Sequence, residues 1–67
     1  MTSGQIGKNL RKARKELGLK QSEVAKKAGI NANYYSRIER GEVNPTIEFI
    51  SKIIKVLKVK SSDILPY

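Results

Sequence analysis

Cysteine, histidine and tryptophan are absent from this 67-residue sequence, and it contains only two prolines. Without cysteine or histidine, the chain offers no disulfide framework, no zinc-finger ligands, no thiol nucleophile and no imidazole for acid–base catalysis. A glycine-rich loop that cradles phosphates is also missing, because Gly4 and Gly7 stand isolated. We therefore expect a protein that is not an enzyme and that has no metal site, no cofactor and no small-molecule substrate.

Long apolar segments are missing as well. No apolar run approaches the ~20 residues of a membrane-spanning helix, and the N-terminal stretch lacks the apolar region of a signal peptide. We expect a cytoplasmic protein with no membrane partner. The length leaves room for a single domain over residues 1–67. Such a domain buries ~60% of the surface of its unfolded chain, so a dimer partner would add to a modest stability.

Acidic residues are few. Six Asp and Glu stand against 14 Lys and Arg, which gives a formal net charge of +8 and a pI near 10.1. A pI above about 9 is typical of a domain that binds nucleic acid. The same excess of positive charge also suits an anionic membrane surface or simple solubility. The charge therefore indicates a function only together with a structural pattern.

That pattern lies in residues 21–40, which read as two short helices separated by Gly29. Gly29 is suited to end the first helix because glycine accepts a positive φ without a Cβ penalty, and Asn31 is a good N-cap for the second. The residues expected to face a shared core are Val24, Ala25, Ala28, Ile30, Tyr35 and Ile38. Two short helices joined by such a turn are the signature of a helix-turn-helix, whose second helix enters the DNA major groove. The alternative is an ordinary helix pair with a solvated polar face.

A further helix is expected before this unit, over residues 5–17. Its cap is either Thr2, which has capping-box spacing to Gln5, or Ser3. Apolar residues recur at helical spacing on one side, and cations fill the other. The apolar residues are Ile6, Leu10, Ala13 and Leu17, and the cations are Lys8, Arg11, Lys12 and Lys15. This helix supplies part of the core under the helix-turn-helix.

The segment after residue 41 supplies the rest of the fold. Thr46 is expected to cap a helix over residues 47–57. A short turn follows, from residue 61 or 62 to residue 65, and ends at Pro66. The whole sequence therefore predicts an all-α fold, a compact domain of five helices with a central helix-turn-helix.

The apolar side of the helix over residues 47–57 is wider than the ~100° stripe that a surface helix needs. One edge of it carries Phe49, Ile53 and Val56. Two interpretations remain open: later residues cover this edge, or it forms the interface of a homodimer. Residues 50–60 also resemble a basic amphipathic segment that lies on a membrane surface, although the need for a core explains the same pattern better.

The chain resembles the Cro/phage-repressor family of XRE-type helix-turn-helix proteins over almost its whole length. The resemblance rests on an ordered set of motifs, which is more specific than any lone dipeptide. It implies a compact all-α domain that binds operator DNA as a transcription regulator. The matching motifs are Ile6-Gly7-Lys8, Leu10-Arg11-Lys12-Ala13-Arg14, Leu17-Gly18-Leu19-Lys20-Gln21, Val24-Ala25-Lys26-Lys27-Ala28-Gly29-Ile30, Ser36-Arg37-Ile38-Glu39-Arg40-Gly41, Asn44-Pro45-Thr46, and Leu57 with Val59.

The resemblance also implies roles for individual residues. Ala32, Asn33 and Arg37 match the positions that reach base edges, and Tyr34 points the same way. Their chemistry agrees with this role, because Asn can bond bidentately to adenine, Arg to guanine, and an Ala methyl can contact the thymine methyl. The expected phosphate contacts are Lys20, Gln21, Asn31, Arg40 and Asn44.

Arg14 and Glu39 match an ion pair that ties the first helix of the family fold to the third. The alternative is two independent surface charges. The chain also departs from the family at two positions. Lys20 stands where Thr or Ser is usual, so the hydroxyl cap toward Glu23 is missing and a cation lies beside a positive helix end. Tyr35 replaces an aliphatic core residue, so its hydroxyl is expected to reach the surface or a partner.

These observations predict a sequence-specific regulator that binds double-stranded DNA as a homodimer on a two-fold operator. The helix that begins at Asn31 would enter the major groove. The alternative is a protein-interaction module, such as an antitoxin or a coactivator-like adaptor, that uses the apolar face of the helix over residues 47–57.

Overall fold

The computed structural model describes residues 3–65. Within that range the secondary structure consists of helices joined by turns and loops, with no strand. The helices are α1 (Ser3–Glu16), α2 (Gln21–Ala28), α3 (Ala32–Glu39), α4 (Ile47–Leu57) and α5 (Ser61–Ile64). The predicted all-α, five-helix fold is thus confirmed. The expected cap at Thr2 and the expected stop at Pro66 lie outside the described residues. Across residues 3–65, each helix is too short or too polar to cross a membrane.

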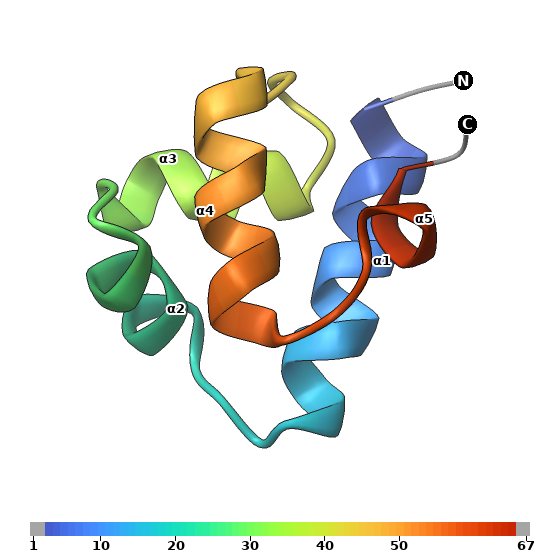
Figure 1. Ribbon diagram of the computed structural model, residues 1–67. Coiled ribbons are helices and arrows are strands. Elements are labelled where there is room, and N and C mark those ends of the chain that lie inside the picture. Colours follow the sequence, from blue (N-terminus) through green and yellow to red (C-terminus); the bar gives the residue numbers. More distant parts are fainter. Residues whose placement is uncertain (1–2, 66–67) are drawn as a thin grey trace.

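The helices surround one apolar core. Figure 1 shows α4 in the centre, with α1 on one side and α2 on the other; α3 passes behind α4 toward α1, and α5 lies against α1. The buried apolar residues come from all five helices, which is why no single helix needs to be stable alone. They are Ile6, Leu10, Ala13, Val24, Ala25, Ala28, Tyr35, Ile38, Ile50, Ile53, Leu57 and Ile64.

The helix-turn-helix has the caps that its sequence predicts. Gly29 ends α2 in the left-handed conformation, with φ at 72°. The Asn31 side chain accepts hydrogen bonds from the backbone N–H groups of Asn33 and Tyr34, at 2.8 and 3.2 Å. These bonds satisfy donors that the first turn of a helix leaves without a partner. The start of α3 is therefore fixed by its own neighbours.

The ends of α4 use two different devices. At its start, Thr46 Oγ1 accepts a hydrogen bond from the Phe49 N–H at 3.1 Å, as the sequence predicts. At its end, Lys58 takes the left-handed conformation with φ at 58°. That conformation usually belongs to glycine, because a Cβ crowds the following carbonyl. The helix therefore ends at a strained lysine.

The helix α1 approaches α3 more closely than side chains normally permit. A Cβ added at Gly7 would lie 2.5 Å from the carbonyl oxygen of Ile38 and closer still to that of Glu39. Real Cβ contacts are not this short, so only glycine fits between the two backbones. Gly7 therefore sets the distance between α1 and the C-terminal end of α3.

The burial of two apolar residues depends on the fold and not on their spacing in the sequence. Leu17 was expected in the core, but α1 ends at Glu16 and the Leu17 side chain is 47% exposed. Its N–H bonds to the Arg14 carbonyl, so a tightened last turn carries the side chain outward. Ile53 lies at the edge of α4 that the sequence leaves open as either covered or a dimer interface, and it is fully buried because α4 packs against α2 and α5.

Candidate nucleic-acid interface

Arg14 and Glu39 lie at the base of the helix-turn-helix and form a two-pronged ion pair. Arg14 Nε lies 2.7 Å from Glu39 Oε2, and Nη2 lies 3.1 Å from Oε1. The pair is nearly removed from water, since the two side chains are only 11% and 2% exposed. Arg14 Nη1 also donates to the Leu19 carbonyl at 2.8 Å. A single guanidinium thus connects α1, α3 and the turn that leads into α2.

The surroundings of Glu39 keep its carboxylate ionised. Burial alone would raise the pKa of this carboxyl, but hydrogen bonds from Arg14 and Gln21 hold the pKa below its ordinary value. Gln21 Nε2 supplies the second bond, at 2.9 Å from Glu39 Oε1. Gln21 Oε1 in turn accepts from Ser36 Oγ at 3.0 Å. The first residue of α2 is therefore bound to the last turns of α3.

The Tyr35 hydroxyl does not behave as the sequence predicts. We expected it to reach the surface or a partner, but it is buried and has no hydrogen-bond partner within residues 3–65. Burial raises the pKa of this phenol, and the nearby Glu39 carboxylate raises it further. A tyrosine in a core position can keep its ring contacts without satisfying its hydroxyl, which sequence patterns do not reveal.

The outward face of α3 carries the three residues that match base-contacting positions. Ala32, Asn33 and Arg37 are all exposed, and Asn33 lies one helical turn before Arg37. The side chain of Asn33 makes no hydrogen bond within the described part of the chain, so its amide can present both a donor and an acceptor. Arg37 is 52% exposed, but its Nε lies 3.4 Å from Glu42 Oε1.

Tyr34 lies at the edge of this face and is half-buried. Its ring meets that of Phe49 edge-on, with centroids 5.5 Å apart and an angle of 67° between the planes. The Lys52 ammonium lies over the Phe49 ring, with Nζ 5.7 Å from the ring centroid. Phe49 of α4 thus packs against Tyr34 of α3, so its ring makes contacts within its own chain.

The three residues predicted to form a dimer interface therefore have other surroundings. Ile53 is wholly buried, while Phe49 and Val56 are half-buried. Most of the wide apolar side of α4 faces the core of its own chain through Ile50, Ile53 and Leu57. Of the two interpretations left open for this edge, cover by the chain's own helices holds at Ile53, which is therefore no interface residue; periodicity shows which residues share a face but not which helices cover it.

The residues predicted to contact phosphates lie at the start of α2 and on either side of α3. Lys20, Asn31, Arg40 and Asn44 are exposed, and Gln21 is half-buried. Lys20 precedes α2, and its N–H donates to Glu23 Oε1 at 2.8 Å, so half of a capping box forms without a hydroxyl.

A cavity of about 320 Å³ opens between α1, α2 and α3. It is lined by Arg11, Arg14, Gln21, Ser36, Glu39 and Arg40.

Two residues of this region were not singled out by the sequence. Ser36 donates to Gln21 and accepts from Arg40 Nη1 at 3.1 Å, so it links α2 to the end of α3. Glu42 contacts Arg40 and Arg37 from the loop after α3. The sequence signal for Glu42 is its negative charge: it is one of six acidic residues in a strongly basic chain, and it follows Arg37 and Arg40 within five positions.

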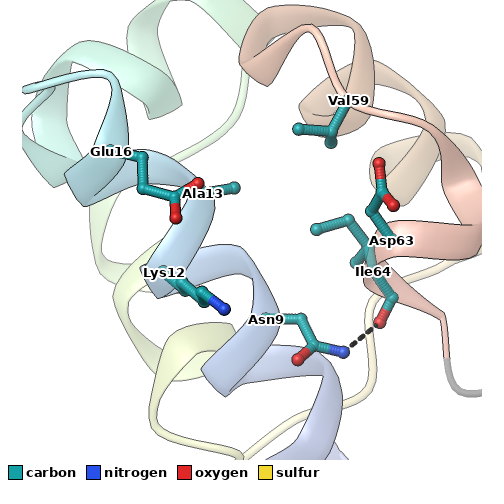
Figure 2. Close-up of a pocket in the computed structure, with 7 residues that line it drawn as sticks. All are labelled: Asn9, Lys12, Ala13, Glu16, Val59, Asp63 and Ile64. Atoms are coloured by element: carbon teal, nitrogen blue, oxygen red, sulfur yellow. Dashed lines mark hydrogen bonds between the residues drawn. The ribbon is translucent and has the colours of Figure 1, made fainter.

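A second cavity lies on another side of the molecule, between α1 and α5. It measures about 370 Å³ and is lined by Asn9, Lys12, Ala13, Glu16, Val59, Asp63 and Ile64. Figure 2 shows Asn9 reaching from α1 to the Ile64 carbonyl, to which its Nδ2 donates at 2.8 Å. The lining mixes both signs of charge with apolar groups. This region therefore ties α5 to α1 and lies apart from the outward face of α3.

Known proteins share this arrangement along most of the chain. A family model described as helix-turn-helix matches residues 10–64. The HTH-type transcriptional regulator SinR of Bacillus subtilis (strain 168) is 43% identical over 61 residues, which are 90% of this chain and 55% of SinR. An uncharacterized HTH-type transcriptional regulator of Sinorhizobium fredii, y4dJ, is 33% identical over 60 residues, which are 90% of this chain and 78% of y4dJ.

Solved structures agree at the level of the fold. The restriction-modification controller protein C.AhdI from Aeromonas hydrophila matches with a TM-score of 0.90 and 27% sequence identity, and the match covers 94% of this chain and 96% of that one. The chain therefore spans about half the length of SinR and has nearly the same extent as the C.AhdI structure.

Proposed function

The chain belongs to the Cro/C1-type helix-turn-helix family of DNA-binding transcription regulators, and from this membership we propose that it binds double-stranded DNA with sequence specificity through α3. One observation carries the proposal. Ala32, Asn33 and Arg37 share the exposed face of a helix whose start is capped and whose end is held by buried polar contacts. A rigid helix with short polar residues at its outward N-terminal end suits the major groove.

In this proposal, direct readout comes from three side chains with different preferences. Asn33 can donate to N7 and accept from the N6 amine of adenine when its amide is suitably turned, which requires both halves of the group. Arg37 can donate two hydrogen bonds to guanine O6 and N7, and the Ala32 methyl can contact the thymine methyl. Tyr34 lies beside them, with its ring held by Phe49.

The backbone of the duplex would be held by residues at the two ends of the helix-turn-helix. Lys20 and Arg40 offer cations, Asn31 and Asn44 offer amides, and the Gln21 N–H lies in the first turn of α2, where helices favour anions. Such contacts position the protein without reading sequence. The net charge of +8 supplies the general attraction to DNA that precedes them.

We further propose that two copies bind a two-fold operator, with their α3 helices in successive major grooves ~34–36 Å apart. The support is an exposed apolar residue at the start of α4. Ile47 is 77% exposed, and it lines a small cavity of about 50 Å³ with Pro45 and Leu65. A second copy would remove this side chain from water.

Selection of bound sites from a random duplex pool tests the proposed function. We expect enrichment of one sequence with two symmetric halves, because each copy reads the same short half-site. A pool that stays random after several rounds, although protein is retained on DNA, would contradict sequence-specific binding. A single enriched half-site without a symmetric second half would contradict only the dimer.

A further inference from the structure

The loop after α3 places a carboxylate directly against two of the cations on the DNA-facing side. Glu42 Oε2 lies 2.7 Å from Arg40 Nε, and Oε1 lies 3.4 Å from Arg37 Nε. Each oxygen of the one carboxylate therefore contacts a different guanidinium. The ordinary expectation for a basic DNA-binding face is that its arginines meet only water and phosphate.

The position of this carboxylate is fixed by the backbone. Gly41 takes the left-handed conformation with φ at 77°, and the Glu42 N–H then donates to the Arg37 carbonyl at 2.9 Å. This is the usual way in which a glycine closes the end of a helix. The turn brings Glu42 back beneath Arg37, so the contact follows from the fold of the loop.

The guanidinium groups bind this carboxylate as they would bind DNA. A carboxylate and a phosphate offer the same pairing of anionic oxygens to a guanidinium, and guanine offers Arg37 two acceptors. The Arg40–Glu42 contact lowers the pKa of the Glu42 carboxyl, so the group is ionised at neutral pH. A phosphate that takes Arg37 or Arg40 must therefore compete with Glu42.

We propose that Glu42 is a specificity-determining residue, because it holds Arg37 and Arg40 in the unbound protein and weakens their attraction to DNA of unrelated sequence. The inference rests on the proposed function. Binding to unrelated DNA depends almost wholly on cations that meet phosphates, so a carboxylate that pairs with those cations lowers it. At the preferred sequence, Arg37 can donate from its two Nη groups to guanine O6 and N7 while its Nε stays beside Glu42, so this contact is kept and Glu42 costs the operator complex little.

The effect can be separated from folding. Glu42 is 48% exposed, and Arg37 and Arg40 are 52% and 55% exposed. Ion pairs in such surroundings contribute little to stability. The Glu42→Gln variant is therefore expected to melt close to the unmutated protein, which a thermal melt followed by circular dichroism checks before any binding is measured.

The experiment compares Glu42→Gln with Glu16→Gln on two duplexes, the selected operator and an unrelated sequence. Glu16 lines the α1–α5 cavity, away from α3 (Figure 2), so its replacement makes the same change in net charge outside the DNA-facing side. We expect Glu42→Gln to tighten binding to the unrelated duplex by about tenfold and to the operator by about threefold or less. In a salt titration on the unrelated duplex, its slope should steepen by ~0.9, the value for one added phosphate contact.

The outcomes distinguish the inference from the proposed function. If Glu42→Gln changes both duplexes by the same factor as Glu16→Gln, Glu42 does not set specificity. Weaker binding of Glu42→Gln to both duplexes would also overturn the inference, because the carboxylate would then be assisting the contacts. If the unmutated protein shows no preference between the two duplexes, the proposed function itself fails.

Discussion

Arg14 shows how few side chains fix the outward face of α3. Its guanidinium bonds to Glu39 on α3 and to the Leu19 carbonyl before α2. Gln21 and Ser36 extend the contacts to the surface. Because these partners come from three segments, the loss of one group disturbs the relative placement of all three. The family resemblance predicts the Arg14–Glu39 pair, but nothing in the sequence predicts the hydrogen bonds through Gln21 and Ser36.

Replacing Arg14 should therefore cost more than replacing an exposed cation. We expect Arg14→Ala to lower the free energy of unfolding by about 3 kcal/mol, because Glu39 stays buried without its main partner. Lys15→Ala, on the exposed side of the same helix, should cost no more than ~0–1 kcal/mol. Urea melts of both variants, and of a double-mutant cycle with Glu39→Gln, measure this. A coupling energy of zero between positions 14 and 39 would show two independent charges.

The lowered pKa of Glu39 makes stability depend on pH in one direction. The folded protein holds this carboxyl ionised below its ordinary pKa of 4.5, so its contribution is present above about pH 4.5 and is lost as the pH falls further. We expect melts between pH 7 and pH 3 to show this acid loss, with a smaller slope in Glu39→Gln. Equal slopes in both proteins would mean that Glu39 does not cause the loss of stability in acid.

Asn33 is the residue expected to read a base most directly. Asn33→Ala should cost ~1–3 kcal/mol on the selected operator and relax the preference at one base pair of each half-site, at an A·T pair. Competition binding with single-base operator variants measures this. The same ratio of operator to random-duplex affinity in both proteins would mean that Asn33 is not a reader and that α3 docks differently.

At the scale of elements, the crossing of α1 over α3 depends on the absence of a side chain at Gly7. Alanine in a helix is normally more favourable than glycine by about 1 kcal/mol. At Gly7, a methyl group would meet the backbone of Ile38 and Glu39 instead of a flexible side chain. The backbone of α3 must then move, and the residues on the outward face of α3 move with it.

Glycine-to-alanine changes in a helix usually stabilise a protein. We expect Gly7→Ala to do the opposite and to destabilise the fold by about 1–3 kcal/mol, the typical cost of overpacking. Gly4→Ala is the matched control, because Gly4 is exposed in the same helix and should follow helix propensity. Thermal melts of both variants measure the difference. A Gly7→Ala protein as stable as the Gly4→Ala protein would mean that the two backbones separate at little cost.

The elements also show what a sequence can and cannot predict. The bounds of α2 and α4 and the caps at Asn31 and Thr46 were predictable, because they depend on residues within a few positions of each other. The surroundings of Leu17 and Ile53 were not, since burial depends on which helices lie across from a face. The contact between Glu42 and the two arginines likewise depends on how the loop turns, a feature of tertiary geometry.

The whole molecule is small, with extents of 27 × 21 × 19 Å. Its core uses nearly all of the large apolar residues in the described range, and the two exposed exceptions are Leu17 and Ile47. Ile47 lies beside other apolar groups, whereas Leu17 lies in the turn before α2. The two residues therefore offer a test of which surface takes part in self-association.

Ile47→Glu is expected to give a folded monomer with weaker operator binding, because the carboxylate would have to be desolvated at the interface. Leu17→Glu introduces the same charge at the other exposed position and should leave the association unchanged. Sedimentation velocity at several concentrations, with and without operator, measures the change. Monomeric behaviour of the unmutated protein at high concentration, even with excess operator half-site, would count against the dimer.

The buried hydroxyl of Tyr35 has a consequence for optical measurements. The chain has no tryptophan, so tyrosine provides most of its near-ultraviolet absorption. The pKa of Tyr35 is raised above its ordinary 10.0 in the folded protein, so the stability linked to this proton is present below pH 10 and falls as the pH rises beyond it. The share of the phenolate absorption that belongs to Tyr35, one of the three tyrosines in the sequence, therefore emerges only as the core opens, and this late part of an alkaline difference spectrum reads unfolding without a dye or a label.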